Sequence, residues 1–354
     1  MKIIVGVSGG VDSAVAALLL REQGHDLEAL FMANWDEDDA YCSQAQDFQD
    51  ARAVCKEIGI VLHRVDFAAE YRRQVFDDFL AAHRAGRTPN PDVLCNREIK
   101  FGVALTHARR LGATHLATGH YARRIDGAEG PELHKAVDRG KDQSYFLHAI
   151  DREQLSAALF PLGMLTKSEV RAKARAAGLP VHDKKDSTGI CFIGERPFRE
   201  FLAQWLPDAP GPVVDEHGVE LGRHRGLAFH TLGQRAGLAI GGLRGRAEAP
   251  WYVARKDIAR NALVVVQGQD HPLSMSQTLV TDRAHWLVSP PADRFGCAAK
   301  IRYRQADQVC EVEVRDDDGL TIRFDAPQRA VTPGQYAVLY EGERCLGGAV
   351  IESI

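Results

Sequence analysis

The sequence predicts an α/β protein with a parallel, doubly wound N-terminal sheet, a small central domain and a C-terminal β domain. Three observations lead to this prediction. Short β-branched runs alternate with helical patterns through the first half of the chain, and a glycine-rich loop joins the first strand to the first helix. After about residue 205 prolines interrupt the helical pattern, and β-type runs with Gly/Asp turns take over. Strands separated by helices imply right-handed crossovers and a parallel sheet covered on both faces.

The individual elements follow from local patterns and their stop signals. The predicted strands of the first half are Lys2–Val7, Leu27–Met32, Ile60–Val65 and His115–Thr118. The predicted helices, most of them ended by a glycine, are Ser13–Gln23, Gln46–Ile58, Glu70–Ala85, Asn96–Leu111 and Lys167–Ala177. The later β-type runs are Trp251–Arg255, Ala262–Val266, Cys310–Val314, Leu320–Phe324 and Tyr336–Tyr340, with a turn at Asp316–Gly319.

The length of 354 residues predicts more than one domain. The changes in texture predict a catalytic domain at 1–204, a central domain at 205–274 and a small β-barrel or sandwich at 275–354.

The composition excludes several classes of protein. Hydrophobic residues make up 45% and charged residues 26%, as in a globular protein. No apolar run approaches the ~18 residues of a membrane span, and Met1 leads directly into the first strand, so we expect a cytoplasmic protein without a membrane partner. Seven cysteines in a chain of this size, an odd number, do not indicate a disulfide scaffold. They include no Cys-x-x-Cys pair, which disfavours a zinc ribbon and an iron–sulfur site of that spacing.

The net charge of −4 is unevenly distributed along the chain. Residues 61–260 hold 31 basic and 24 acidic residues, a local balance of +7. This region could face phosphates if its arginines cluster in space, but a mixed solvated surface fits the charge equally well.

The loop Gly6-Val7-Ser8-Gly9-Gly10-Val11-Asp12-Ser13 has the features of a phosphate-binding turn. Its glycines let the backbone approach an anion, and the following helix offers free N–H groups and a positive dipole end. It contains no Gly-Lys-Ser/Thr and does not follow Gly-x-Gly-x-x-Gly. Asp12 could cap the helix or hold Mg²⁺ beside the phosphates.

Two cysteines stand out by their neighbours. Cys95 follows Asn90-Pro91-Asp92 and is predicted at or just before the start of a helix, where a thiolate is favoured. Asp92 could accept its proton or reach a substrate base. Cys191 lies between glycines with cations nearby, which suits a reactive thiol, although the surrounding run could equally be a short strand. The remaining cysteines, Cys42, Cys55, Cys297, Cys310 and Cys345, have unremarkable surroundings.

The Ser-Gly-Gly-x-Asp-Ser run of the loop resembles that of ATP pyrophosphatases, which cleave ATP between the α- and β-phosphates and adenylate a substrate oxygen. Met32 then falls where that family stacks the adenine, although a core methionine is nearly as good an interpretation. An adenylating enzyme with two paired thiols points to sulfur insertion through thiol–disulfide exchange.

Over essentially its whole length the chain resembles the bacterial tRNA-specific 2-thiouridylases. The segments that carry this resemblance are Gly6–Ser13, Thr88–Phe101, Thr118–Arg123, Lys141–Leu147, Ser187–Pro197, Thr231–Arg235, Gly237-Leu238, Gly241-Gly242, Lys300–Tyr303 and Val331–Gln335.

The resemblance implies an adenine nucleotide alpha-hydrolase-like domain, a central domain and a tRNA-binding β-barrel. It implies that Gly6–Ser13, Met32 and Gly119 bind ATP, with Mg²⁺, and that a persulfide donor protein (a cysteine desulfurase or a relay protein) supplies sulfur. The implied roles of the other residues are a nucleophile at Cys95, a persulfide carrier at Cys191, contact with the target base at Asn90, Pro91 and Asp92, and contact with tRNA at His120, Lys141, Asp142, Gln143, Arg302, Tyr303 and Gln335. Taken alone, His120 is more often a packing histidine, whereas Arg302 and Tyr303 suit a phosphate contact and a stacking face.

Two other functions compete with thiolation. An amidating ligase or synthetase with the same loop would need an ammonia source or an amino-acid site but no paired loop cysteines. A non-catalytic RNA-binding module would leave the glycine loop unexplained.

Overall fold

The computed structural model describes residues 1–35, 44–186, 197–238, 240 and 249–354. Its N-terminal layer is a five-stranded sheet with the order β3-β2-β1-β4-β7, in which every neighbouring pair is parallel. The strands are β1 (Lys2–Gly6), β2 (Asp26–Ala33), β3 (Val61–Asp66), β4 (His115–Ala117) and β7 (Ala158–Leu159). The predicted parallel sheet is therefore confirmed, and β7, which is too short to give a pattern, is an addition.

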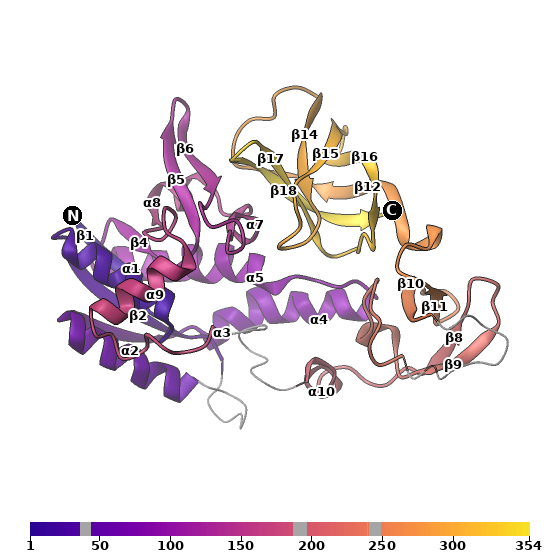
Figure 1. Cartoon of the computed structure of the whole chain (residues 1–354), viewed down its shortest axis with the longest axis horizontal. Coiled ribbons are helices and arrows are strands. Elements are labelled where there is room, and N and C mark those ends of the chain that lie inside the picture. Colours follow the sequence, from indigo (N-terminus) through magenta and orange to yellow (C-terminus); the bar gives the residue numbers. More distant parts are fainter. Residues whose placement is uncertain (36–43, 187–196, 239, 241–248) are drawn as a thin grey trace.

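Helices cover both faces of this sheet (Figure 1). Since successive strand residues point to opposite faces, Ile3 and Val5 pack in one hydrophobic core while Ile4 packs in the other. The helices of the first core are α1 (Val11–Glu22), α2 (Gln44–Ile58) and α9 (Lys167–Ala176). Those of the second are α3 (Ala68–Tyr71), η1 (Arg72–Phe76), α4 (Asp77–Arg84), α5 (Pro91–Leu94), η2 (Cys95–Ala104), α6 (Leu105–Arg110), α7 (Ser144–Leu147), α8 (Arg152–Ala157) and α10 (Phe198–Ala203).

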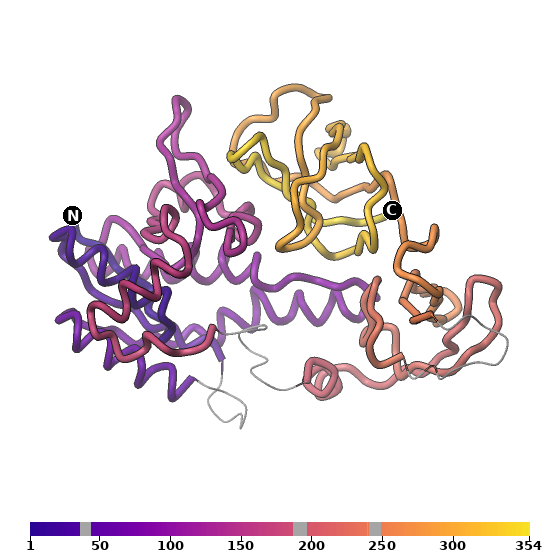
Figure 2. The backbone as a smooth tube through the Cα atoms, viewed as in Figure 1, coloured from indigo at the N-terminus to yellow at the C-terminus, as the bar shows by residue number. Residues whose placement is uncertain are grey.

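Two long helical rods extend beyond the N-terminal sheet. The first runs without a break from Ala68 to Arg84 and the second from Pro91 to Arg110, each with a central stretch of wider π-type turns. They contact one another through α3 and η1 of the first and α5 and η2 of the second. The end of the first rod, α4, reaches towards the central domain (Figure 2).

The central domain is a four-stranded sheet with the order β10-β11-β8-β9. Its elements are β8 (Gly211–Val214), β9 (Glu220–His224), η3 (Leu227–Phe229), β10 (Trp251–Asp257) and β11 (Ala262–Gln267). Its own small core contains Val213, Val253, Leu263 and Val265, all fully buried.

The C-terminal domain is a closed antiparallel barrel with the order β12-β16-β15-β14-β17-β18, closed by pairing of β12 with β18. Its elements are η4 (Pro272–Ser274), β12 (Met275–Arg283), β13 (His285–Trp286), β14 (Arg294–Lys300), β15 (Gln308–Val314), β16 (Gly319–Arg329), β17 (Tyr336–Glu341) and β18 (Arg344–Ser353). The predicted turn before Gly319 joins β15 to β16, and Asp318 has the left-handed φ of 63° that such a turn requires. Closure leaves no free edge strand, and the predicted barrel is confirmed. The division of the chain at 204/205 and 274/275 stays a prediction.

A hairpin that the sequence pattern did not reveal connects the N-terminal domain to the barrel. It consists of β5 (Ala122–Gly127) and β6 (Gly130–Lys135), and β6 pairs with β18 through His134 and Arg344. The charged residues of β5 conceal its strand pattern, because its stability depends on pairing with distant chain rather than on local hydrophobicity.

Buried ions fasten the hairpin to the barrel. Lys135 is 3% exposed and donates to Asp307 (2.5 Å) and to the carbonyl oxygen of Gly342 (2.8 Å). Lys300 lies 3.5 Å from Asp142, and both lysines stand over the ring of Tyr340. Removing one member of such a set would leave a buried charge unpaired, so the network fixes how the two domains join.

Among the described residues no helix is both long enough and apolar enough to cross a membrane.

Three buried histidines predict that acid destabilises the protein. Burial lowers the pKa of His83 and of His230 to about 4 and that of His148 to about 3, against about 6.5 in an unfolded chain. Since the unfolded state then binds more protons, the stability is present above pH 6.5 and is lost as the pH falls towards these folded values. We expect the free energy of unfolding to fall by about 1.4 kcal/mol per pH unit and per histidine in this window, measured by denaturant unfolding from pH 7 to pH 4.5.

The variant His83→Gln, which does not titrate, should show a shallower acid slope. His217→Gln is the control, because the side chain of His217 is 72% exposed, and it should match the wild type. An acid slope unchanged in His83→Gln would contradict the prediction.

Candidate functional site

The glycine loop folds back on itself after β1. The hydroxyl of Ser13 donates to the carbonyl oxygen of Gly10 (3.1 Å) and accepts a hydrogen bond from the backbone N–H of Ser8 (3.1 Å). Gly9 has a φ of +76°, and a Cβ at this position would lie 2.3 Å from the carbonyl oxygen of Asp47. The tight turn therefore requires glycine at position 9 for both its conformation and its space.

The start of α1 is open to an anion. Its N-cap is Gly10, and no side chain caps it, so its first N–H groups have no partner within the helix. Gly119 crosses this helix start so closely that a Cβ would lie 2.7 Å from the backbone nitrogen of Ser13. The Met32 Cε is 3.3 Å from where a Cβ of Gly6 would stand. The predicted ATP-binding residues thus gather at the carboxyl ends of β1, β2 and β4, where parallel sheets bind ligands.

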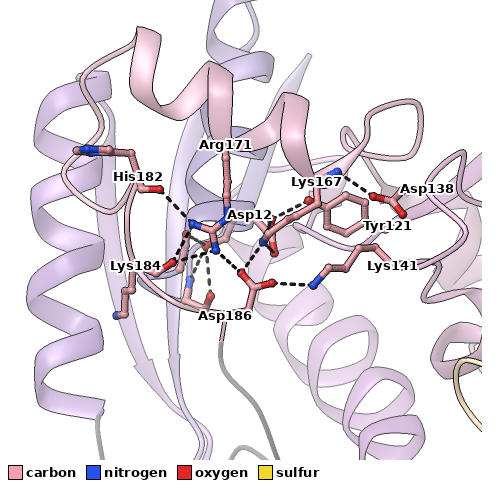
Figure 3. A network of polar contacts seen from close by, with 12 residues as sticks. Asp12, Tyr121, Asp138, Lys141, Lys167, Arg171, His182, Lys184 and Asp186 are labelled. Carbon is pink, nitrogen blue, oxygen red and sulfur yellow. Dashed lines mark hydrogen bonds and ion pairs between the residues drawn. The ribbon is translucent and has the colours of Figure 1, made fainter.

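Asp12 belongs to a network of charges in front of this helix (Figure 3). Lys167 donates to both of its carboxylate oxygens at 2.7 Å, and the hydroxyl of Tyr121 donates to one of them at 2.8 Å. Lys167 also pairs with Asp186 at 2.8 Å, and Lys141 donates to Asp186 at 2.7 Å. Lys141, for which the family resemblance implies a tRNA contact, therefore lies beside the glycine loop.

A second lysine on the same side holds the turn itself. Lys184 donates to the carbonyl oxygen of Gly9 (3.1 Å) and to the carboxylates of Asp47 (2.7 Å) and Asp50 (2.5 Å). Burial lowers the pKa of Lys184, but the hydrogen bonds that it donates to these carboxylates have the larger combined effect, so the pKa is raised. It stays charged at neutral pH and ties α2 to the loop.

The described residues do not form a metal site by themselves. No group of three or more His, Cys, Asp or Glu side chains within the described part of the chain could hold a metal ion. Both oxygens of Asp12, the residue predicted to bind Mg²⁺, already accept hydrogen bonds from Lys167. This arrangement does not fit a resident ion.

Cys95 lies in a helix, and its position corrects the sequence prediction. The helix begins at Pro91 rather than Asn96, with Asn90 as N-cap accepting a hydrogen bond from the N–H of Asp92 (3.2 Å). Proline is favoured at this first position because its missing N–H is not needed there. Cys95 therefore lies beyond the first turn, where the influence of the helix dipole has declined, and it is only 4% exposed.

Asp92 stands on the same helix three residues before Cys95. Burial raises its pKa, while the nearby charge of Lys100 lowers it in part. A carboxyl group with a raised pKa is a better proton acceptor than an ordinary one. The geometry keeps both predicted roles of Asp92 open.

Cys191 and Cys42 lie outside the described residues. Among the other cysteines, Cys55, Cys310 and Cys345 are buried, and burial raises the pKa of Cys55 to about 11 and that of Cys345 to about 12. These thiols are suited to packing rather than to chemistry.

Two of the residues with implied tRNA contacts are buried. His120 is 7% exposed and its Nδ1 lies 2.8 Å from the hydroxyl oxygen of Thr118. Burial, together with the charge of Lys100, lowers its pKa well below the usual value. Asp142 is 4% exposed and accepts hydrogen bonds from the backbone N–H groups of Ala136 and Ser144. His120 thus packs against Phe101 and Phe160, and Asp142 holds the segment that follows β6. Their contacts with tRNA stay a prediction.

Other residues with implied tRNA contacts are more accessible. Arg302 is exposed, and Tyr303 packs against Phe146 with ring centroids 4.5 Å apart. The guanidinium group of Arg304 lies over the ring of Tyr303, 5.3 Å from its centroid. Gln143 instead accepts a hydrogen bond from the backbone N–H of Tyr121 at 3.0 Å.

Gln335 holds the loop that leads to Cys95. Its side-chain amide donates to the carbonyl oxygen of Thr88 at 2.7 Å, and the Thr88 N–H donates to Pro333 at 2.9 Å. From the central domain, the Thr231 hydroxyl lies 3.3 Å from that of Thr88, and Lys256 donates to the carbonyl oxygen of Gly86 at 2.8 Å. The loop before Asn90 is thus held by both C-terminal domains, and we call these four contacts the Thr88 clasp.

Sequence reasoning missed the residues that complete the site. Only the folded structure shows that Tyr121 and Lys167 contact Asp12 of the glycine loop and that Arg171 contacts Asp186. Lys167 opens a predicted helix, but its sequence position does not indicate this role. Thr231 and Lys256 join the Thr88 clasp from more than a hundred residues away. No local pattern marks contacts of this kind.

The chain matches three family models in succession. Residues 1–195 match the tRNA methyl transferase HUP domain, 199–267 the tRNA methyl transferase PRC-barrel domain and 276–351 the Aminomethyltransferase beta-barrel domain. The chain is 53% identical over 354 residues to proteins named tRNA-specific 2-thiouridylase from Francisella tularensis subsp. tularensis and subsp. novicida, covering 99% of both chains in each case.

Solved structures resemble the chain more distantly. A U34-tRNA thiolase from Methanococcus maripaludis is 19% identical with a TM-score of 0.36, covering 54% of this chain and 60% of that one. An NMN synthetase from Francisella tularensis is 20% identical with a TM-score of 0.33, covering 52% and 66%. Both likenesses are too remote to bear on function.

The geometry of the loop predicts that Gly9→Ala lowers the affinity for ATP by more than about tenfold, because the added methyl group forces the turn away from Asp47. Isothermal titration with ATP measures the effect. Gly24→Ala is the matched control, since Gly24 has the same φ of +76° but nothing within 4 Å of the added Cβ. Equal losses in both variants would mean that backbone strain alone, and not the shape of the loop, was measured.

The Thr88 clasp predicts that Gln335→Met lowers kcat by about five- to thirtyfold, as expected for one lost hydrogen bond in a partly buried place, with the affinity for ATP unchanged. Gln277→Met is the control, because Gln277 is an exposed barrel residue that donates to the carbonyl oxygen of Phe324. A loss confined to the KM for RNA would show that Gln335 acts by contact with RNA alone.

Proposed function

Because the chain belongs to the tRNA-specific 2-thiouridylase family, we propose that it replaces the C2 oxygen of a tRNA wobble uridine with sulfur at the expense of ATP. The 53% identity over nearly the whole of both chains carries this proposal. The family models name methyl transfer, but the full-length relatives are named for thiolation. The amidating ligase considered as an alternative is not favoured by these relatives.

ATP supplies the activation. In the proposed reaction the C2 oxygen of uridine attacks the α-phosphorus, the bond to the β-phosphate breaks, and pyrophosphate leaves. The free N–H groups at the start of α1 and the Ser8 and Ser13 hydroxyls are suited to the charge that gathers on the phosphates. Adenylation converts a poor leaving oxygen into AMP.

Sulfur then arrives through the two cysteines. In the proposed relay an external donor (a cysteine desulfurase or a relay protein) leaves a persulfide on Cys191. Its terminal sulfur attacks C2 and AMP departs, after which the Cys95 thiolate attacks the Cys191 sulfur and releases 2-thiouridine. Alternatively Cys95 attacks first and releases hydrosulfide, which then attacks C2. Both routes leave a Cys95–Cys191 disulfide, which an external thiol reduces.

The surroundings of Cys95 suit a flipped-out base. An anticodon loop presents an unpaired base that can enter a pocket without the cost of opening a duplex. Asn90, Pro91 and Asp92 form the first turn of the helix that carries Cys95, and we assign them to the target base. We assign Arg302 and Tyr303 on the barrel to the tRNA, and we assign the protein to the cytoplasm, where tRNA is processed.

Mg²⁺ enters the proposal only as an ion that accompanies the nucleotide. The Asp12 oxygens are occupied by Lys167, so Asp12 would become a ligand only after Lys167 turns to the phosphates. No step of the reaction above depends on this ion.

Mass spectrometry of nucleosides tests the function directly. Wobble-uridine tRNA incubated with the protein, ATP and a persulfide donor should yield 2-thiouridine, AMP and pyrophosphate in equal amounts. Absence of 2-thiouridine, with small carboxylates consumed instead, would reject thiolation in favour of ligase chemistry.

The relay predicts distinct outcomes for its two cysteines. Cys95→Ser should lower thiolation by at least about a hundredfold, since a hydroxyl group is a poor replacement for a thiolate. Cys191→Ser should lose the reaction with a persulfide donor but regain part of it with free sulfide, whereas Asp12→Ala should not.

Cys297→Ser is the control, since Cys297 lies in the barrel strand β14, and it should thiolate at the normal rate. If Cys191→Ser still accepted sulfur from the persulfide donor at the wild-type rate, the carrier role would be wrong.

A further inference from the structure

One carboxylate stands among three cations beside the glycine loop. Asp186 accepts from Lys141 at 2.7 Å, from Lys167 at 2.8 Å and from Arg171 at 2.8 Å. Figure 3 shows these three side chains converging on Asp186 from α9 and from the segment after β6. A single acidic residue so placed occupies a site that is built to hold an anion.

The position of this site relates it to the nucleotide. The Lys167 ammonium group is shared between Asp186 and Asp12, the second residue of α1. Lys167 therefore lies beside the uncapped start of α1, and Asp186 links Lys141 and Arg171 to it. Any phosphate bound at that helix start would come within reach of the same lysines.

The three cations differ in what else holds them. Arg171 also donates to the carbonyl oxygens of His182 and Lys184, so it anchors the segment that carries Asp186. Within the described residues, the ammonium group of Lys141 has no acceptor other than Asp186. Lys141 can therefore exchange Asp186 for another anion, and Lys167 can do so while it keeps Asp12, whereas Arg171 is fixed.

Among the described residues the side chains of Lys141, Lys167 and Arg171 form ion pairs with two carboxylates, those of Asp12 and Asp186. A third carboxylate, that of Asp138, accepts from the backbone N–H of Lys167 at 2.9 Å. Burial raises the pKa of Asp186, but its hydrogen bonds with Lys141 and Lys167 outweigh this and hold the pKa at about 2. It is therefore ionised and repels an incoming phosphate.

We propose that Lys141 and Lys167 bind the β- and γ-phosphates of ATP, the pyrophosphate that later leaves, and that Asp186 occupies their place in the free enzyme. ATP must displace this carboxylate in order to bind, so Asp186 weakens the affinity of the site for polyphosphates. The inference rests on the proposed ATP-dependent function and names the side chains that receive its leaving group.

Titration with inorganic pyrophosphate and with ATP tests the proposal. Asp186→Asn should bind both about three- to tenfold more tightly than the wild type, and the gain should shrink at high salt. Asp186→Glu, which keeps the charge, should resemble the wild type.

Lys141→Met should bind pyrophosphate about three- to tenfold more weakly while its affinity for adenosine is unchanged. Asp183→Asn is the control, because its carboxylate is 72% exposed and pairs with Arg175 and His182. Its affinities should stay at the wild-type level.

Weaker or unaltered pyrophosphate binding by Asp186→Asn would overturn the proposal and show that Asp186 merely organises the lysines. A folded Lys141→Met variant with normal pyrophosphate affinity would overturn it as well. A melting temperature near that of the wild type shows that a variant is folded. Thiolation of tRNA by the same wild-type preparation distinguishes failure of this inference from failure of the proposed function. If the wild type thiolates but the variants do not behave as expected, only this inference fails; if it neither binds ATP nor thiolates, the proposed function fails.

Discussion

The arrangement of the three domains depends on hydrogen bonds that the barrel and the central domain form with the short loop containing Gly86 and Thr88. The backbone of Thr88 is bonded through both its N–H and its carbonyl group to the barrel, and Gly86 is bonded to Lys256 of the central domain. The helix of Asp92 and Cys95 begins just after this loop. Because hydrogen bonds to backbone atoms leave little freedom to the chain they hold, these contacts restrict the direction of the helix. Its core also includes Phe229 of the central domain and Tyr336 of the barrel.

A second link joins the nucleotide side of the molecule to the barrel. Gly119 packs on the start of α1, and the chain then enters the β5–β6 hairpin, in which strand β6 pairs with β18. The buried ions Lys135, Lys300 and Asp142 close this joint. Since a buried charge is costly unless its partner is in place, the joint favours one arrangement of the domains.

The environment of Cys95 shows how local reasoning about reactivity can be incomplete. Its neighbours in sequence predicted a thiol at a helix start, whereas Pro91 extends the helix backwards and moves Cys95 into a buried position beyond the first turn. In the proposed relay the reactivity of Cys95 would therefore depend on its buried surroundings, where the pKa of Asp92 is raised, rather than on the helix dipole. The same holds for His120, whose polar side chain serves the packing of Phe101 and Phe160.

The sequence by itself determined those features that depend on local physics. The structure has several such features where the sequence predicts them. They are the burial of β1 on both faces, glycine at the tight turn of position 9, and the helix stops at Gly24, Gly59 and Gly112. Only the tertiary structure decided which charges meet. Lys141 lies beside Asp186, Gln335 beside Thr88 and Lys135 beside Asp307, across 45, 247 and 172 residues of chain. Such pairs arise when the assembled layers bring distant side chains into a place of low dielectric, and no periodic pattern in the sequence records that encounter.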